Sequence, residues 1–533
     1  MARGAPGAPG RRGRRVGEPD RIAAAAGEDL IGHAPVLAAV IHWLTGVVFA
    51  VILGTLLIFV APAIPGLGPG LGEIQEKGVD SSMKVRVITR GPADQTLPAG
   101  VTGYVFVDID PAACTAARLG PRCLDRAPTE PGLTARIARA VLGAKPRVVI
   151  LDATLWDIDP GRSTPAVDFA ALAKAARDHP ASPIVAAAPF RPTGAADAGV
   201  LEWDLVPAPL RGGVVRFAPA MLWRAANEPD DVVRSYSPLA QVQAGATSQP
   251  VPTLPLLAAL YAEAGGDAAR IRGVDCRYGA LIGAPVGRCA TLGAAPAADR
   301  VLQRAETLYP DARLVFTLPP LVSPAGKSAA RAAAQFQNVY DRYPASQAFS
   351  PAGALLIDPG QLAGKIVVIS TSAPTALDFH STPLGPMSGA ELVLNAVAAM
   401  LDRHGWVAAP SVGQRALHEV EIIGLASLPF LLFWLGYCWL AHGLRGRRGA
   451  GLVVGLYGGV GFIIAIGAAT LLAAAITLES VEHGLANGFA AEFFSPILAL
   501  SLEGFAEGAR WLVDRIESGV DRLVRRVPLP KRV

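Results

Sequence analysis

The sequence predicts an α/β protein in which a doubly wound, mostly parallel sheet forms an extracytoplasmic domain. An α-helical membrane region contributes one span before this domain and three after it. Two observations predict this class. Between about residues 100 and 400, short apolar segments alternate with amphipathic helical segments, which is the pattern of parallel βαβ units. The long apolar runs lie outside that region, at about residue 50 and beyond about residue 420.

Composition sets limits on the class of protein. The chain has 533 residues, which is enough for two or three domains. Hydrophobic residues make up 51% of it, so part of the chain is expected in a lipid bilayer. The formal net charge of +4 is too small to indicate a nucleic-acid partner.

The N-terminal region contains a predicted tail and a first span. Residues 1–29 are mostly Gly, Pro, Ala and Arg, so we expect a disordered, basic, cytoplasmic tail. Residues 36–61 are apolar and long enough for a spanning helix, which needs about 20 residues. A cleaved signal peptide is the alternative, but its apolar region would have only about 7–15 residues. The length favours an uncleaved anchor.

Three spans are predicted after the domain, at residues 422–441, 450–478 and 484–502. The last contains Glu492, which either faces the helix bundle or has a function. Its crossing would return the arginine-rich tail, residues 503–533, to the cytoplasm, as the positive-inside rule favours. We therefore expect a multi-pass protein of the bacterial inner (plasma) membrane, with both termini cytoplasmic and the large domain in the periplasm or outside.

The extracytoplasmic domain is expected to comprise residues 73–416. Buried strands followed by amphipathic helices recur along it, which implies right-handed crossovers and a parallel sheet. The predicted strands are 103–108, 147–151, 183–187, 214–217 and 366–370, and the predicted helices are 129–144, 164–178, 254–264 and one starting near residue 388.

Four of the five cysteines lie in this domain as two close pairs, Cys114 with Cys123 and Cys276 with Cys289. In an oxidising compartment such spacing favours two disulfides, with free thiols as the alternative. Neither pair has C-x-x-C spacing or nearby paired histidines, so we expect no metal site.

Carboxylates follow two of the predicted strands. Asp108 and Asp110 come at the end of the first strand, and Asp152 follows the second. Because parallel strands end at the same sheet edge, these groups could together bind a cation or a hydroxyl- or amine-bearing ligand. The alternative is that each caps a turn or a helix.

The D-x-D sequence at Asp108 and Asp110 also fits a haloacid-dehalogenase-type phosphatase. That chemistry needs a later lysine and an acidic pair for magnesium. Beyond Ser370 the only lysine is Lys531, in the predicted cytoplasmic tail. We therefore expect no enzymatic activity and no cofactor.

Residues 364–403 carry the most specific pattern in the chain. A lysine precedes a buried strand, and D-x-x-x-T-P follows from Asp378 to Pro383, before G-x-E at a helix start. This order resembles the C-terminal signature of the type-2 CHASE domain, an extracytoplasmic sensory module of bacterial receptors. Asp378 and Thr382 lie where open α/β sheets place ligand sites, although they could instead fix the loop. Arg234, after an aspartate turn and before a buried helix, also resembles the family.

The resemblance implies a transmembrane sensory protein that detects an unknown extracytoplasmic ligand. Apolar residues at helical spacing predict an amphipathic helix in 503–533 that lies on the inner leaflet, or pairs with a partner or with itself. We expect no fused output domain, so a separate cytoplasmic kinase or cyclase is the expected partner, and a homodimer is expected by analogy. The alternatives are a membrane scaffold or envelope-assembly protein, and a receptor remnant that lacks its output domain.

Overall fold

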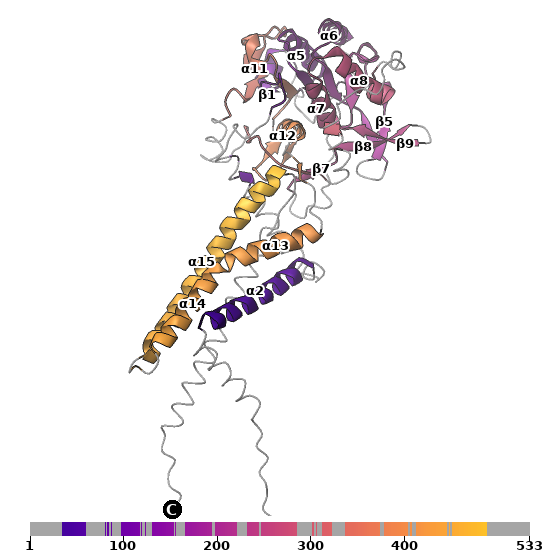
Figure 1. Ribbon diagram of the computed structural model, residues 1–533. Coiled ribbons are helices and arrows are strands. Elements are labelled where there is room, and N and C mark those ends of the chain that lie inside the picture. Colours follow the sequence, from indigo (N-terminus) through magenta and orange to yellow (C-terminus); the bar gives the residue numbers. More distant parts are fainter. Residues whose placement is uncertain are drawn as a thin grey trace, which may run out of the picture. The chain divides into compact units, whose positions relative to one another are not determined.

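A computed structural model describes residues 35–59, single positions between 80 and 87, and residues 97–487 with internal gaps. The larger gaps are 124–129, 156–165, 221–231, 285–300, 306–311 and 322–335. The described chain forms two compact units, an α/β domain within residues 72–411 and a unit of apolar helices (Figure 1). The predicted tail 1–29, residues 488–502 of the fourth span, the tail 503–533 and Cys289 lie outside the described residues.

A six-stranded sheet forms the centre of the α/β domain, and all its neighbouring strands are parallel. The doubly wound, mostly parallel sheet was therefore predicted correctly. In sheet order the strands are β11 (Tyr340–Pro344), β1 (Tyr104–Asp108), β12 (Ile366–Ser370), β2 (Val148–Leu151), β3 (Ile184–Ala187) and β6 (Arg216–Ala218).

Helices cover the sheet in two pairs. α5 (Pro131–Gly143) packs on α6 (Ala166–Asp178), and α7 (Leu254–Ala264) packs on α12 (Gly389–Leu401). Figure 1 shows the pairs on opposite sides of the sheet. Strands β1, β2 and β12 are consequently buried along their whole length. This explains why they read as continuous apolar runs rather than as alternating patterns.

The predicted strands and helices match the observed ones to within two residues. Strand 366–370 and helix 254–264 have the same bounds in the structure as in the prediction. Between residues 191 and 352 prediction found only one strand, whereas the structure has several. They form a four-stranded sheet of β4 (Phe190–Pro192), β5 (Ala198–Leu201), β8 (Leu239–Ala244) and β9 (Thr247–Pro252), and part of a three-stranded sheet of β7 (Ser235–Tyr236), β10 (Ala312–Leu314) and β15 (Trp406–Val407).

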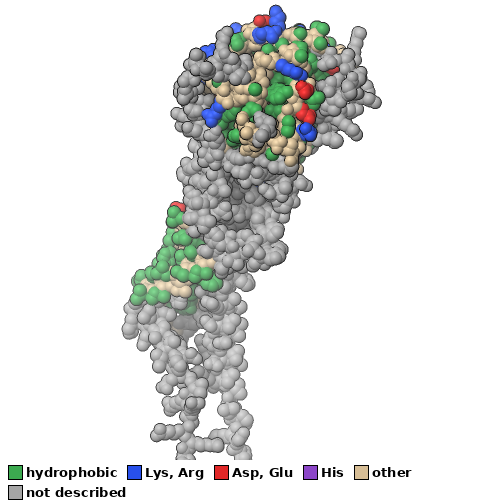
Figure 2. All heavy atoms as spheres, turned by 90° about the vertical axis from the view of Figure 1, so that its right-hand side faces the viewer, with side chains coloured by type: hydrophobic (Ala, Val, Ile, Leu, Met, Phe, Trp, Pro, Cys, Tyr) green, Lys and Arg blue, Asp and Glu red, His purple; other side chains and the backbone are tan. Residues whose placement is uncertain are grey.

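The helical unit contains α2 (Pro35–Phe59), α13 (Val412–Ala426), α14 (Leu428–Gly443) and, as far as Leu478, α15 (Ala450–Asn487). Among the described residues, two stretches are long and apolar enough to span a membrane, Val420–Gly443 and Val453–Leu472. Large apolar side chains are exposed along them. Figure 2 shows hydrophobic side chains gathered in one green area outside the α/β domain. The number of spans and their orientation remain predictions.

Two details of the helices differ from the predicted spans. Residues 422–441 were expected to form one helix, but the helix breaks between α13 and α14 at Ser427, because Pro429 has no N–H to donate. Trp43 on α2 donates a hydrogen bond to Ser427 Oγ at this break, at 2.9 Å. The predicted spans 450–478 and 484–502 leave residues 479–483 between them, but these residues are helical, because α15 continues to Asn487 and no proline interrupts it.

Candidate ligand site at the carboxyl edge of the sheet

The strand register places two of the predicted site residues, Asp108 and Asp152, at one edge of the sheet. Asp108 at the end of β1 is the register partner of Ser370 at the end of β12. Ile369 of β12 pairs with Leu151 of β2, and Asp152 follows directly. The carboxyl ends of β1, β12 and β2 are therefore neighbours, which is where open α/β sheets bind ligands.

Asp108 is buried, and its carboxylate accepts hydrogen bonds from two residues, Ser372 and Arg342. Its side chain is 1% exposed, and it accepts hydrogen bonds from Ser372 N at 2.7 Å and from Ser372 Oγ at 2.6 Å. Arg342 of β11 donates to the same carboxylate from Nε at 2.9 Å and from Nη2. The guanidinium itself is about one-third exposed, at 32%. Arg342 thus neutralises a buried acid while keeping one side open to solvent.

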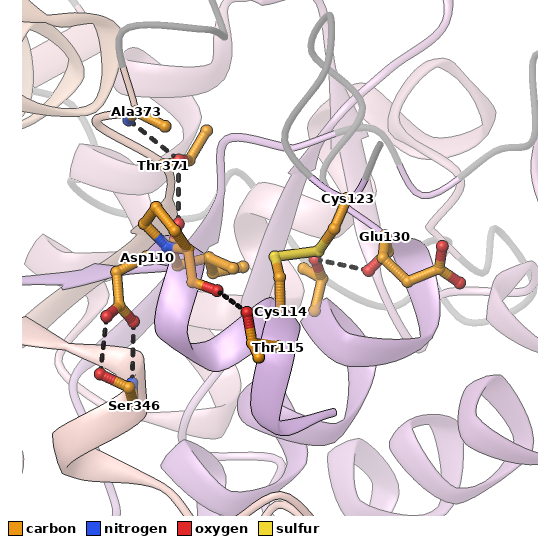
Figure 3. The surroundings of a disulfide bond; sticks show 11 residues. Asp110, Cys114, Thr115, Cys123, Glu130, Ser346, Thr371 and Ala373 are labelled. Atoms are coloured by element: carbon orange, nitrogen blue, oxygen red, sulfur yellow. Dashed lines mark hydrogen bonds between the residues drawn. A yellow bond between two sulfur atoms is a disulfide. The ribbon is translucent and has the colours of Figure 1, made fainter. Parts of the chain in front are cut away.

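Asp110 has a structural role in the described chain. Its carboxylate accepts from the backbone N of Ser346 at 2.9 Å and from Ser346 Oγ at 2.6 Å (Figure 3). Ser346 lies in the short helix α11 (Ala345–Ala348), which directly follows β11. Asp110 therefore joins the ends of β1 and β11, as the capping alternative predicts.

Asp152 is a weaker acid than an ordinary aspartate. The pKa of its carboxyl is raised from 3.8 to about 7, chiefly by burial and then by the negative charge of Asp378, while His380 and the Ser370 hydroxyl oppose the rise. The Ser370 hydroxyl also donates to the backbone oxygen of Asp152 at 2.6 Å. Asp152 is only partly exposed, and its carboxyl keeps its proton up to nearly neutral pH.

The second carboxylate of this pair, Asp378, lies against the start of α12. Its backbone oxygen accepts from Gly389 N at 2.9 Å, and its side chain contacts Gly389 where a Cβ would otherwise be. His380 Nε2 lies 3.0 Å from Asp378 Oδ1. His380 is in β13 (Phe379–His380), which pairs with β14 (Met387–Ser388) directly before the helix. The positive end of α12 thus lies beside Asp378.

The other two predicted ligand residues make contacts within the fold. Thr382 is buried, and its hydroxyl donates to Gly385 O at 2.5 Å, which closes the turn between β13 and β14. Arg234 forms a buried ion pair with Asp80, with Nη2 2.8 Å from Oδ2. The structure therefore brings Asp108 and Asp152 to one edge of the sheet, and the charge of Asp378 raises the pKa of Asp152. Arg234 and Thr382 instead bond to other parts of the fold. Ligand binding by any of them remains a prediction.

Sequence reasoning missed Arg342 and Ser372, which hold Asp108. The only signal for Arg342 was a charged residue within a short aromatic segment, Tyr340 to Tyr343, in a region rich in Pro, Ala and Gly. Ser372 follows the strand that was predicted, and a run of small hydroxyl residues after a strand could have indicated it.

Two buried polar residues of α12 hold a distant segment. Glu391 is 0% exposed and accepts from Leu321 N at 2.6 Å, and it completes a capping box with Ser388. Asn395 Oδ1 accepts from Thr317 N at 3.1 Å and Leu318 N at 2.9 Å, and its Nδ2 donates to Leu318 O. Glu391 belongs to the G-x-E pattern, so that part of the pattern has a structural role.

The first predicted disulfide is present. Cys114 and Cys123 are bonded, with their Cα atoms 6.0 Å apart, in the segment next to Asp110 (Figure 3). Cys276 is also disulfide-bonded, while its predicted partner Cys289 lies outside the described residues. Cys438 of α14 is a free thiol. Within the described part of the chain, no group of three or more His, Cys, Asp or Glu side chains could hold a metal ion.

The fold and its flanking helices define a class, an α/β domain bounded in sequence on both sides by apolar helices. The family model of the CHASE2 domain matches residues 50–436. The chain therefore belongs to the CHASE2 domain family, as the resemblance predicted. CHASE2 is an extracytoplasmic sensory domain of signalling proteins. No curated protein and no solved structure matches the chain.

Proposed function

We propose that this protein is a transmembrane sensor of the bacterial plasma membrane. Its CHASE2 domain detects an extracytoplasmic stimulus, and the membrane helices relay it to a separate cytoplasmic kinase or cyclase. The protein itself catalyses no reaction in this proposal. The observation that carries it is the extent of the family match, which begins within α2, includes the whole α/β domain and ends within α14.

The stimulus is proposed to act at the carboxyl edge of the sheet. Arg342 offers a partly exposed cation there, and Asp152 offers a carboxyl whose pKa near 7 is sensitive to a neighbouring charge. Hydroxyls of Ser370 and Ser372 lie between them in the strand order. Groups of both signs with hydroxyls between them suit a small polar ligand better than an apolar one.

The relay is proposed to run through the spans on either side of the domain. α2 precedes the domain and α13 follows it, and the two helices contact each other as well as α14. A shift of one against the other would reach the residues beyond α15, where the sequence pattern of 503–533 predicts an amphipathic helix. That helix would contact the cytoplasmic partner.

A thermal-shift experiment on the full chain in lipid nanodiscs tests the sensory function. Periplasmic metabolites, nucleotides and metal ions would be added to the wild type, Asp152→Asn and Asp168→Asn. Asp168 is an ion-pair residue of α6 and serves as the control. A ligand that raises the Tm of wild type and Asp168→Asn, but not of Asp152→Asn, supports a sensor with its site at this edge. A chain that melts cooperatively and responds to no compound would favour a scaffold that binds proteins.

A further inference from the structure

The chain enters and leaves the α/β domain through segments that are distant in sequence. It enters after α2, and the first described residues of the domain are Asp80, Met83, Lys84 and Val87, all helical. Three of them are buried and Lys84 is exposed, which is the pattern of a helix with one face packed on the domain. The chain leaves through β15, five residues before α13 begins.

Arg234 contacts the entering segment through its side chain. Its Nε lies 3.2 and 3.1 Å from the two carboxylate oxygens of Asp80, and its Nη2 lies 2.8 Å from Oδ2. The two side chains are only 6% and 10% exposed. A buried, multiply bonded ion pair of this kind is strongly destabilised when one partner is lost, because the other charge stays buried.

Through its backbone, the same residue contacts the strands by which the chain leaves. Arg234 O accepts a hydrogen bond from Leu314 N at 2.8 Å. Leu314 belongs to β10, which pairs on one side with β7, directly after Arg234, and on the other with β15. In the β10–β15 ladder, Leu314 is the register partner of Trp406.

We propose that the Asp80–Arg234 ion pair is a latch that couples the entry of the chain into the domain to its exit. While the latch is closed, movement of the first membrane helix is transmitted through Asp80, Arg234 and β10 to β15 and the helix that follows it. When the latch opens, the two connections move independently. A role for the latch in signalling rests on the proposed sensory function. The coupling itself depends only on contacts within the domain and does not need that function.

The domain contains a second buried ion pair that serves as a matched control. Arg216 of β6 binds both oxygens of Asp275, at 3.1 and 2.8 Å, and Tyr261 donates to the same carboxylate at 2.6 Å. Asp275 lies in α8 (Ala268–Tyr278). Neither residue belongs to the helical residues at the entry of the chain or to the strands at its exit, so loss of this pair should destabilise only its own surroundings.

Hydrogen–deuterium exchange on the full chain in nanodiscs of phosphatidylethanolamine and phosphatidylglycerol tests the latch. In Asp80→Asn, we expect amide exchange to rise on the order of a hundredfold in peptides that contain 80–87, 312–314 and 406–407, with β2 unchanged. In Asp275→Asn, those three peptides should exchange as in the wild type. If Asp80→Asn accelerates exchange in 80–87 alone, the latch does not couple the two connections and the proposal is wrong.

A measurement on the wild type covers the case in which Asp80→Asn does not fold. With increasing urea, segments that open in one cooperative step approach the same opening free energy and the same urea dependence. We expect 80–87, 312–314 and 406–407 to behave as one such group. Independent opening of 80–87 and 406–407 would overturn the proposal. Because no ligand enters these experiments, a negative result leaves the sensory function standing, and a failed ligand screen leaves the latch standing.

Discussion

The carboxylate of Asp378 occupies the space that a side chain at Gly389 would need. A Cβ built on Gly389 would overlap all three carboxyl atoms of Asp378. Gly389 is the first residue of α12, and its backbone N donates to Asp378 O at 2.9 Å. The glycine therefore lets the acidic loop pack onto the helix start, where the helix dipole favours a negative charge.

Replacing Gly389 by alanine should expel the Asp378 side chain from this position. We expect the substitution to lower the free energy of unfolding by about 1–3 kcal/mol, despite the better helix propensity of alanine, because the overlap forces the loop to move. Gly143, in the last turn of α5, provides the control, because a Cβ added there would meet no atom within 4 Å. Urea denaturation of both variants checks this, and equal stability of Gly389→Ala and Gly143→Ala would contradict it.

Asp152 should make the stability of the domain depend on pH. The folded domain holds this proton more tightly than the unfolded chain, since the pKa rises from 3.8 to about 7. Its contribution to stability is therefore complete below about pH 4 and is lost as the pH rises to about 7. We expect a loss of about 2–4 kcal/mol across that window, reduced from the full effect because Asp152 is partly exposed.

Asp152→Asn tests this directly by removing the titrating group. Urea denaturation between pH 4 and 8 should show the stability of the variant relative to wild type rising with pH. Asp110→Asn, just after β1, is the control: it retains Asp152 and should therefore still lose stability between about pH 4 and 7. Parallel curves for wild type and Asp152→Asn would show that the proton is not held at this carboxyl.

Arg342 should be needed to keep Asp108 buried. In Arg342→Met, the Asp108 carboxylate would keep Ser372 as a donor but lose its cation, and we expect a loss of about 2–4 kcal/mol. The exposed pair of Arg191 and Glu202 supplies the control, because Arg191→Met should cost less than about 1 kcal/mol. Similar losses in the two variants, measured by thermal denaturation, would mean that Arg342 acts as an ordinary surface residue.

The central strands could be predicted because burial on both faces leaves an unbroken apolar run, as in β2 and β12. The strands between residues 191 and 352 could not, since pairing partners far apart in sequence define them. β11, for example, contains two charged residues and is recognisable only beside β1.

The candidate site was predictable in part for a related reason. Asp108 and Asp152 follow recognisable strands, so their common edge could be inferred from the parallel arrangement. Their partners could not be inferred. Arg342 lies 234 positions from Asp108 in sequence, and Asp80 lies 154 positions from Arg234. No local pattern specifies which cation meets which acid.

Asn395 should be the most sensitive polar position of α12. Its side chain bonds the backbone N–H groups of Thr317 and Leu318 and the carbonyl of Leu318, all in a buried region. Asn395→Leu has a similar volume but would leave these three groups without their partner, and unsatisfied buried groups cost about 1–3 kcal/mol each. We expect a loss of at least about 3 kcal/mol, with faster amide exchange at Thr317 and Leu318.

Leu394→Ala, the adjacent fully buried residue, is the control: it should destabilise the domain by about 2–5 kcal/mol through a cavity. In that control the exchange at residues 317 and 318 should rise only in proportion to global stability. If Asn395→Leu shows the same proportional behaviour, α12 does not hold this segment through Asn395, and the burial of this amide needs another explanation.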